Sequence, residues 1–272
     1  TFIDPMGREL SFQVVKEKIE ALNEKGIASI AYGAVYASLK DFHERHKEWG
    51  LYKRNGKPFE LIKKFYIMDI SDDSKWSEHI IKEFEKVIEA GFDGIHLDQY
   101  GFPKWALREN NGEKEMVSLA ENYPRLINRV KDALVPINPE VGLIFNNVSN
   151  YPVFSTALAK QEAIYIEVWK PIQSFYELKN LILRARELGG EKSVILAAYL
   201  PAFNKNSEVP AEEAENGALL TMATIFSNGA YHLLLGEDEK ILTVAYYPDY
   251  GVLRERFIKE IRNYFDFIVR YG

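Results

Sequence analysis

Two carboxylates stand out in the sequence because each one ends an apolar run of strand length. Asp98 ends the run in GFDGIHLDQYG, and Glu167 ends the run in AIYIEVW. Glycoside hydrolysis needs such a pair, because one carboxyl group attacks the anomeric carbon or activates water while the other protonates the leaving oxygen. A single carboxylate at the end of a strand is more often a helix cap or a solvated loop residue. The hypothesis therefore depends on the pair.

The residues around the two carboxylates suggest different roles for them. Glu167 follows an apolar run and comes shortly before Trp169. An apolar environment disfavours the charged form of a carboxyl group, as a proton donor requires. Asp98 is followed by Gln99 and Tyr100, which could supply hydrogen bonds that keep it ionised.

Other polar and aromatic side chains follow the remaining apolar runs, and such a ring is the surface expected for a polyhydroxyl ligand. They are Tyr32, Asp69, Asn146, Asn147, Tyr199, Glu237 and Asp238. The segment DISDDS around Asp69 is typical of a polar loop with helix caps. Glu237 and Asp238 lie in a charged loop and are expected to be solvated. For Asn146 and Asn147, a cap, a turn and a sugar contact remain open.

The elements that must position these residues alternate between strands and helices. Apolar runs predict seven strands, at residues 27–33, 64–70, 92–97, 141–145, 163–166, 193–198 and 230–235. Helical periodicity predicts helices at residues 11–25, 38–54, 75–90, 114–134, 153–160, 174–188, 211–227 and 252–271. Repeated strand–helix units of this size indicate parallel strands joined by crossover helices.

A barrel and a doubly wound sheet both fit this alternation. No glycine-rich phosphate loop follows the first strand, which counts against a dinucleotide-binding sheet. We therefore predict a TIM-type (β/α)8 barrel, forming a single domain over residues 1–272. A barrel needs eight strands, so the first strand is expected to be missing at the N-terminus. In such a barrel Asp98 and Glu167 stand at the same rim.

Composition excludes several other functions. The chain has 272 residues, a net charge of −6 and no cysteine, which excludes disulfides and thiolate metal sites. It has no basic run of the kind that binds nucleic acid and no apolar stretch near the ~20 residues of a membrane span. No zinc-site set of carboxylates and histidines is recognised, and His96 is expected to be a hydrogen-bonded barrel-interior residue. We predict no cofactor and no metal.

At these residues the sequence resembles glycoside hydrolase family 66, the dextranases and cycloisomaltooligosaccharide glucanotransferases. The resemblance is carried by DPMGRELSFQVVKEKIEAL, AYGAVYAS, GFDGIHLDQYG, IYIEVW and YYPDY, in the family's order over almost the whole chain. The pair GIHLDQYG and YIEVW is its most specific part. The family's first-strand motif, which contains aromatic residues and histidine, is missing, as are the flanking β-domains. We therefore expect a barrel core cut from a longer enzyme.

The resemblance implies a retaining enzyme acting on α-1,6-linked glucan or isomaltooligosaccharides, with Asp98 as the nucleophile and Glu167 as the acid/base. It also implies that five residues border the sugar subsites: Tyr32, Gln99, Asn146, Trp169 and Tyr199. No inserted carbohydrate-binding module of the kind found in many cyclising members is seen, which favours an endo-acting dextranase over a glucanotransferase. An α-galactosidase-like barrel and a non-catalytic glucan-binding barrel remain alternatives. The family implies secretion or cell-surface location, and the oligomeric state is left open.

Overall fold

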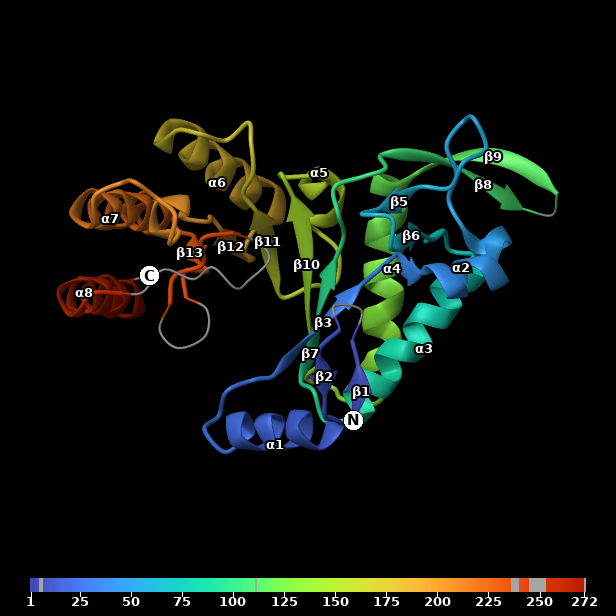
Figure 1. Cartoon of the computed structure of the whole chain (residues 1–272), viewed down its shortest axis with the longest axis horizontal. Coiled ribbons are helices and arrows are strands. Elements are labelled where there is room, and N and C mark those ends of the chain that lie inside the picture. The colour runs from blue at the N-terminus through green and yellow to red at the C-terminus, as the bar shows by residue number, and fades with distance from the viewer. Residues whose placement is uncertain (5–6, 111, 236–239, 245–252, 272) are drawn as a thin grey trace. The chain divides into compact units, whose positions relative to one another are not determined.

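The computed structural model describes residues 1–4, 7–110, 112–235, 240–244 and 253–271 (Figure 1). The chain divides into two compact units, Thr1–Phe145 with Leu158–Glu162, and Asn146–Ala157 with Ala163–Gly272. The prediction of one domain over residues 1–272 stays a prediction. Within the described part of the chain, no helix has the length and hydropathy to cross a membrane.

The first unit contains a parallel sheet in the order β10-β7-β3. Its strands are β3 (Ile30–Ala34), β7 (Gly94–Asp98) and the first part of β10 (Gly142–Val148). Ala34 lies opposite Asp98 in the register of β3 and β7. A Cβ atom on Gly94 would collide with the carbonyl oxygen of Gly142, so the close approach of β7 to β10 requires glycine at this position.

Helices α3 (Lys75–Glu89) and α4 (Leu119–Leu134) pack against each other in the first unit, which also contains α1 (Phe12–Asn23). The Ser77 N–H donates a hydrogen bond of 3.2 Å to the Ser74 hydroxyl at the start of α3. Ser74 therefore caps this helix, which confirms the interpretation of the DISDDS segment.

The other strands of the first unit pair antiparallel, and its other helices are short. A hairpin is formed by β8 (Trp105–Asn110) and β9 (Glu113–Ser118). A three-stranded sheet has the order β4-β6-β5, from Ala37–Leu39, Phe65–Ile67 and Glu60–Leu61. The remaining elements are β1 (Phe2–Ile3), β2 (Glu9–Leu10), α2 (Lys40–Arg45) and the 3-10 helix η1 (Lys47–Trp49).

The second unit continues with the end of β10 and the parallel strands β11 (Ala163–Glu167), β12 (Ser193–Ala197) and β13 (Tyr231–His232). Its helices are α5 (Val153–Thr156), α6 (Phe175–Gly189), α7 (Ala211–Ser227), α8 (Glu255–Tyr271) and the 3-10 helix η2 (Pro201–Phe203). Apolar residues of the strands and of α6 and α7 form one core cluster, including Ile164, Leu196, Ile182 and Met222. The apolar runs of β11 and β12 are buried for this reason.

The α/β class with parallel strands is confirmed, but the expected closed barrel is not formed by the described residues. Among them, β3 pairs with β7 alone and β13 with β12 alone, so each has a neighbour on one side only. The predicted strand at residues 64–70 is also wrong as a parallel strand. Its core, β6, pairs antiparallel with β4 and β5, a distinction that an apolar run alone does not carry.

Three predicted helices are clearly shorter than expected. The helix predicted at residues 153–160 is limited to α5, Val153–Thr156. Residues 114–118 belong to β9, so the helix expected from residue 114 begins at Leu119. Glu and Lys in this segment are good helix formers, but cross-strand pairing with β8 decides its conformation. The helix expected over residues 38–54 is limited to α2 and η1, and Leu51 instead donates a backbone hydrogen bond to Ile67.

Candidate active site

Asp98 is buried at the carboxyl end of β7 in the first unit. Its carbonyl oxygen accepts a hydrogen bond of 2.9 Å from the Val35 N–H, which continues the pairing with β3. Its Oδ2 accepts a hydrogen bond of 2.5 Å from the Tyr32 hydroxyl. Tyr32 is 64% exposed, so this donor to the carboxylate is a side chain that reaches solvent.

The loop after Asp98 is held by hydrogen bonds from buried polar side chains to its backbone. The Tyr36 hydroxyl donates to the Phe102 carbonyl at 2.7 Å and accepts from the Tyr100 N–H at 2.6 Å. Burial raises the pKa of Tyr36 well above its usual value, so the hydroxyl keeps its proton. The Gln99 side chain is buried too, and its Oε1 accepts from the Gly101 N–H at 2.5 Å. Gln99 therefore supports the loop, and its role as a sugar contact stays a prediction.

Glu167 is buried at the carboxyl end of β11 in the second unit. Its Oε1 accepts a hydrogen bond of 2.8 Å from the Tyr199 hydroxyl, and its Oε2 accepts one of 3.2 Å from the Asn146 Nδ2. Asn146 lies on β10, and Tyr199 follows the end of β12. Neighbouring strands of the parallel sheet thus place a donor on each oxygen of this carboxylate.

Trp169 and Tyr199 form an aromatic pair beside Glu167. Their ring centroids are 5.5 Å apart and their planes are tilted by 54°. Trp169 is 38% exposed, so part of the indole face is available for contact. A flat apolar face with polar groups next to it suits a pyranose ring.

Asn147 has a structural role that sequence reasoning did not separate from that of Asn146. It is fully buried, its Nδ2 donates to the Tyr165 carbonyl at 2.9 Å, and its Oδ1 accepts from the Thr156 hydroxyl at 2.7 Å. These bonds connect β10 to β11 two residues before Glu167. The alternation of side chains along a strand explains why neighbouring asparagines point to different partners.

Asp69 and Arg108 belong to a structural network in the first unit. Asp69 accepts hydrogen bonds from the Ser71 N–H and hydroxyl at 3.0 and 2.6 Å, and its Oδ2 is 3.3 Å from the Arg108 guanidinium. Arg108 also forms ion pairs with Asp73 and Glu115. These carboxylates raise the pKa of Arg108. Arg108 was missed because the hairpin that carries it was not predicted.

The histidines of the described part of the chain form no metal centre, and no group of three or more His, Asp and Glu residues there could hold a metal ion. His96 lies on β7 with its ring centroid 6.2 Å from that of Tyr32. His232 is buried on β13, with Nε2 2.8 Å from the Ala198 carbonyl oxygen. Burial lowers the pKa of His232 to about 4. Glu237 and Asp238 lie outside the described residues.

The structure therefore brings the predicted site residues together in two groups. In the first unit, Tyr32 contacts Asp98, and Gln99 follows in the same loop. In the second unit, Glu167 is contacted by Asn146 and Tyr199. Trp169 completes the second group through its contact with the Tyr199 ring.

Comparison with known proteins extends these observations. The family model of glycosyl hydrolase family 66 matches residues 1–272. A cycloisomaltooligosaccharide glucanotransferase from Niallia circulans is 27% identical over 248 residues, covering 85% of this chain and 25% of that protein. The chain thus spans about a quarter of the length of the curated relatives it matches.

Solved structures show similar folds. The cycloisomaltooligosaccharide glucanotransferase of Paenibacillus sp., complexed with cycloisomaltoheptaose, has a TM-score of 0.63 and 25% identity, covering 74% of this chain and 30% of that one. The α-galactosidase of Thermus thermophilus in complex with stachyose has a TM-score of 0.56 and 14% identity, covering 92% and 52%. The second likeness is one of fold alone.

Proposed function

We propose that this chain, which belongs to glycosyl hydrolase family 66, carries the groups that cleave α-1,6-glucosidic bonds inside dextran chains. The observation that carries the proposal is the placement of Asp98 and Glu167. Each is buried at the carboxyl end of a parallel strand and accepts hydrogen bonds from hydroxyl or amide groups. In parallel α/β folds, reacting groups occupy these strand ends.

In the proposed reaction, Asp98 acts as the nucleophile and Glu167 as the acid and base. Glu167 donates its proton to the glycosidic oxygen while Asp98 Oδ attacks the anomeric carbon, which gives a glycosyl ester and releases the shortened glucan. Water then attacks the ester, Glu167 takes its proton, and Asp98 leaves as a carboxylate. Net retention at the anomeric carbon follows from the two displacements.

This mechanism sets a requirement on the distance between the two carboxyl groups. The carboxyl groups of a retaining pair lie about 5–5.5 Å apart. A TIM-type (β/α)8 barrel, with Asp98 and Glu167 at one rim, would meet the requirement. We keep that architecture, and the secretion or cell-surface location that the family implies, as parts of the proposal.

The similarity to named relatives supports an α-1,6-glucan as the substrate. The Niallia circulans and Paenibacillus sp. proteins are named for cycloisomaltooligosaccharides, which are rings of α-1,6-linked glucose. The names also favour a second candidate function, glucanotransfer. In that case a sugar hydroxyl of the bound chain, in place of water, resolves the glycosyl ester, and a cyclic glucan results.

The test is the release of reducing sugar from dextran by the protein and by Asp98→Gly and Glu167→Gln. Each variant should lose at least about 10³-fold in activity. Exposed carboxylates replaced as matched controls, Glu121→Gln and Asp266→Asn, should keep full activity. Azide can enter the space left by a missing carboxylate, so glycosyl azide should form, and its anomeric configuration identifies which residue was the nucleophile.

The products distinguish the candidate functions. Linear oligosaccharides with new reducing ends indicate hydrolysis, and cyclic products without reducing ends indicate glucanotransfer. Full activity in Asp98→Gly or Glu167→Gln would overturn the role of that residue. A protein that binds dextran but forms neither product would be the non-catalytic glucan-binding alternative.

A further inference from the structure

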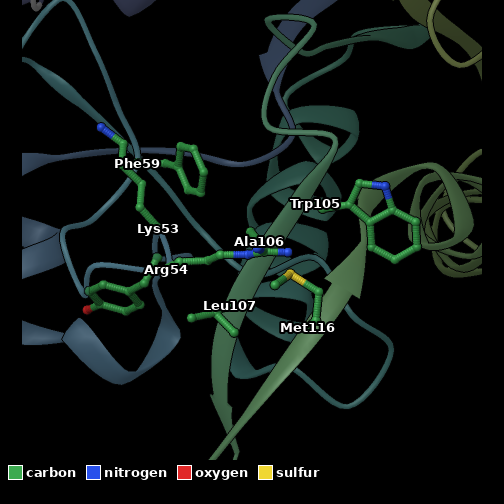
Figure 2. A pocket seen from close by; sticks show the side chains of 8 residues that line it. Lys53, Arg54, Phe59, Trp105, Ala106, Leu107 and Met116 are labelled. Carbon is green, nitrogen blue, oxygen red and sulfur yellow. The ribbon is translucent and has the colours of Figure 1, made fainter.

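A groove in the first unit has neither of the candidate catalytic carboxylates in its lining. It is formed between the loop at residues 52–59 and the β8–β9 hairpin, with a volume of about 420 Å³ (Figure 2). We call it the hairpin groove. Its walls include Tyr52, Arg54, Phe59, Trp105, Leu107 and Met116. Its volume falls within the ~300–1,000 Å³ of small-molecule sites.

The two walls of the hairpin groove are fixed to each other. Tyr52 and Leu107 exchange backbone hydrogen bonds, each N–H donating to the other carbonyl at 2.8 Å. Arg108, the next residue of β8, is buried and forms ion pairs with Asp69 and Asp73. The hairpin is therefore anchored at two successive residues, Leu107 and Arg108, and the groove exists before any ligand binds.

The surface of the hairpin groove combines apolar area with nitrogen donors. Trp105 is 58% exposed and Met116 is 41% exposed. Figure 2 shows the Arg54 side chain extending from the loop toward the hairpin strand that carries Ala106. The Lys53 ammonium lies 5.5 Å from the centre of the Phe59 ring, a cation–π contact that keeps both groups at the wall.

This combination suits a pyranose better than an anion. A sugar ring can lay its C–H face on the Trp105 indole while its hydroxyls accept hydrogen bonds from Arg54 and Lys53. The wall of the groove carries Lys53 and Arg54, and an anionic polymer is disfavoured only at long range, by the net charge of −6.

We propose that the hairpin groove binds a segment of an α-1,6-glucan chain, as a second glucan site in addition to Asp98 and Glu167. The inference rests on the proposed function for its choice of sugar. A long chain held there dissociates more slowly than a short one that reaches the catalytic residues alone, because two contacts on one chain act together. The site would thus favour polymeric dextran over short oligosaccharides.

Trp105→Ala tests the proposal, with Tyr176→Ala as the matched control. Tyr176 is also a highly exposed aromatic residue, but it lies on α6 in the second unit. Retention on dextran should be measured by affinity electrophoresis, and kcat/KM should be measured on long dextran and on isomaltotriose. For Trp105→Ala, we expect dextran affinity and the ratio of the two kcat/KM values to fall about tenfold. Arg54→Gln should also lower the dextran affinity and the kcat/KM ratio. Tyr176→Ala should change neither quantity.

The outcomes separate this inference from the proposed function. If the protein cleaves dextran and Trp105→Ala changes neither the affinity nor the ratio, the groove is no glucan site, while the catalytic proposal stands. An equal loss on both substrates would also overturn a separate site. Competition by dextran sulfate but not by dextran would replace the glucan with an anionic ligand. A protein that neither binds nor cleaves dextran would overturn both proposals.

Discussion

The carboxyl ends of β7 and β11 hold their carboxylates in different ways. Asp98 accepts a hydrogen bond from Tyr32, a side chain that is mostly in solvent. Glu167 accepts hydrogen bonds from the buried Asn146 and from Tyr199, which is itself packed against Trp169. An exposed partner can be replaced by water or substrate at small cost, whereas a buried network fixes one geometry.

The Glu167 end has further polar contacts close to it. In the second unit, the residue before Tyr199 is Ala198, whose carbonyl oxygen is 2.8 Å from the Nε2 of the buried His232. The Glu167 carbonyl accepts a hydrogen bond of 2.9 Å from the Ser149 N–H. The Glu167 end thus has polar contacts from β10 and from the segment after β12, and among these Asn146 and His232 are buried. This suits a group that must donate and then accept a proton from one position.

Acid should reveal this difference most strongly, through His232. Burial lowers its pKa to about 4, below the ~6.5 of an unfolded histidine. His232 therefore does not reduce the free energy of unfolding above pH ~6.5. As the pH falls from ~6.5 toward 4, the free energy of unfolding decreases by about 3 kcal/mol in all, because the unfolded chain binds a proton that the folded chain does not. Urea unfolding at pH 7 and pH 4.5 should show that His232→Gln loses about 2–3 kcal/mol less over this range than the unchanged protein.

His43 provides the comparison in the first unit. It is buried and its pKa is also lowered, by burial and by Lys47, so His43→Gln should reduce the acid sensitivity in the same direction. We expect the effect to be smaller than that of His232→Gln. If His232→Gln and the unchanged protein lose the same free energy of unfolding between pH 7 and pH 4.5, His232 is not the source of the acid sensitivity.

The sequence was informative where an element is long and its pattern is local. The helix predicted at residues 211–227 has these bounds in α7, and the strand ends at Asp98 and Glu167 lie where the apolar runs end. Tyr199 was found by the same rule, since side chains after parallel strands gather at one edge of the sheet. Tyr32, which was expected at a strand end, lies within β3.

Strand pairing and the separate roles of neighbouring side chains could not be predicted, because they depend on partners that are distant in sequence. β6 reads as an apolar strand, but it pairs antiparallel with β5 across the turn at Ile62 and Lys63, both with positive φ, and with β4, which is distant in sequence. The β8–β9 hairpin contains charged residues that also favour helices. The separate fates of Asn146 and Asn147 depend on the faces of β10, which meet Glu167 on one side and Thr156 on the other.

Those two asparagines provide a sharper test of the Glu167 end. Asn147→Ala removes the partner of the Tyr165 carbonyl and of the Thr156 hydroxyl in a fully buried place, and should lower the free energy of unfolding by about 1–3 kcal/mol. Asn146→Ala is the matched control, because its amide contacts Glu167. It should cost less stability and more activity. If both changes destabilise equally in urea unfolding, the division of roles is wrong.

The last comparison removes one hydroxyl at each strand end. Tyr199→Phe deletes the donor to Glu167 Oε1. In the proposed reaction Glu167 becomes charged as it gives up its proton, and a hydrogen bond to a charged group contributes about 1.5–3 kcal/mol. We therefore expect kcat on dextran to fall about 10- to 100-fold. Tyr32→Phe deletes the donor to Asp98 Oδ2, but Tyr32 is mostly exposed and water can take its place. Its kcat should fall less than about tenfold. A larger loss in Tyr32→Phe would mean that the end of β7 is the rigid one, and would reverse the comparison.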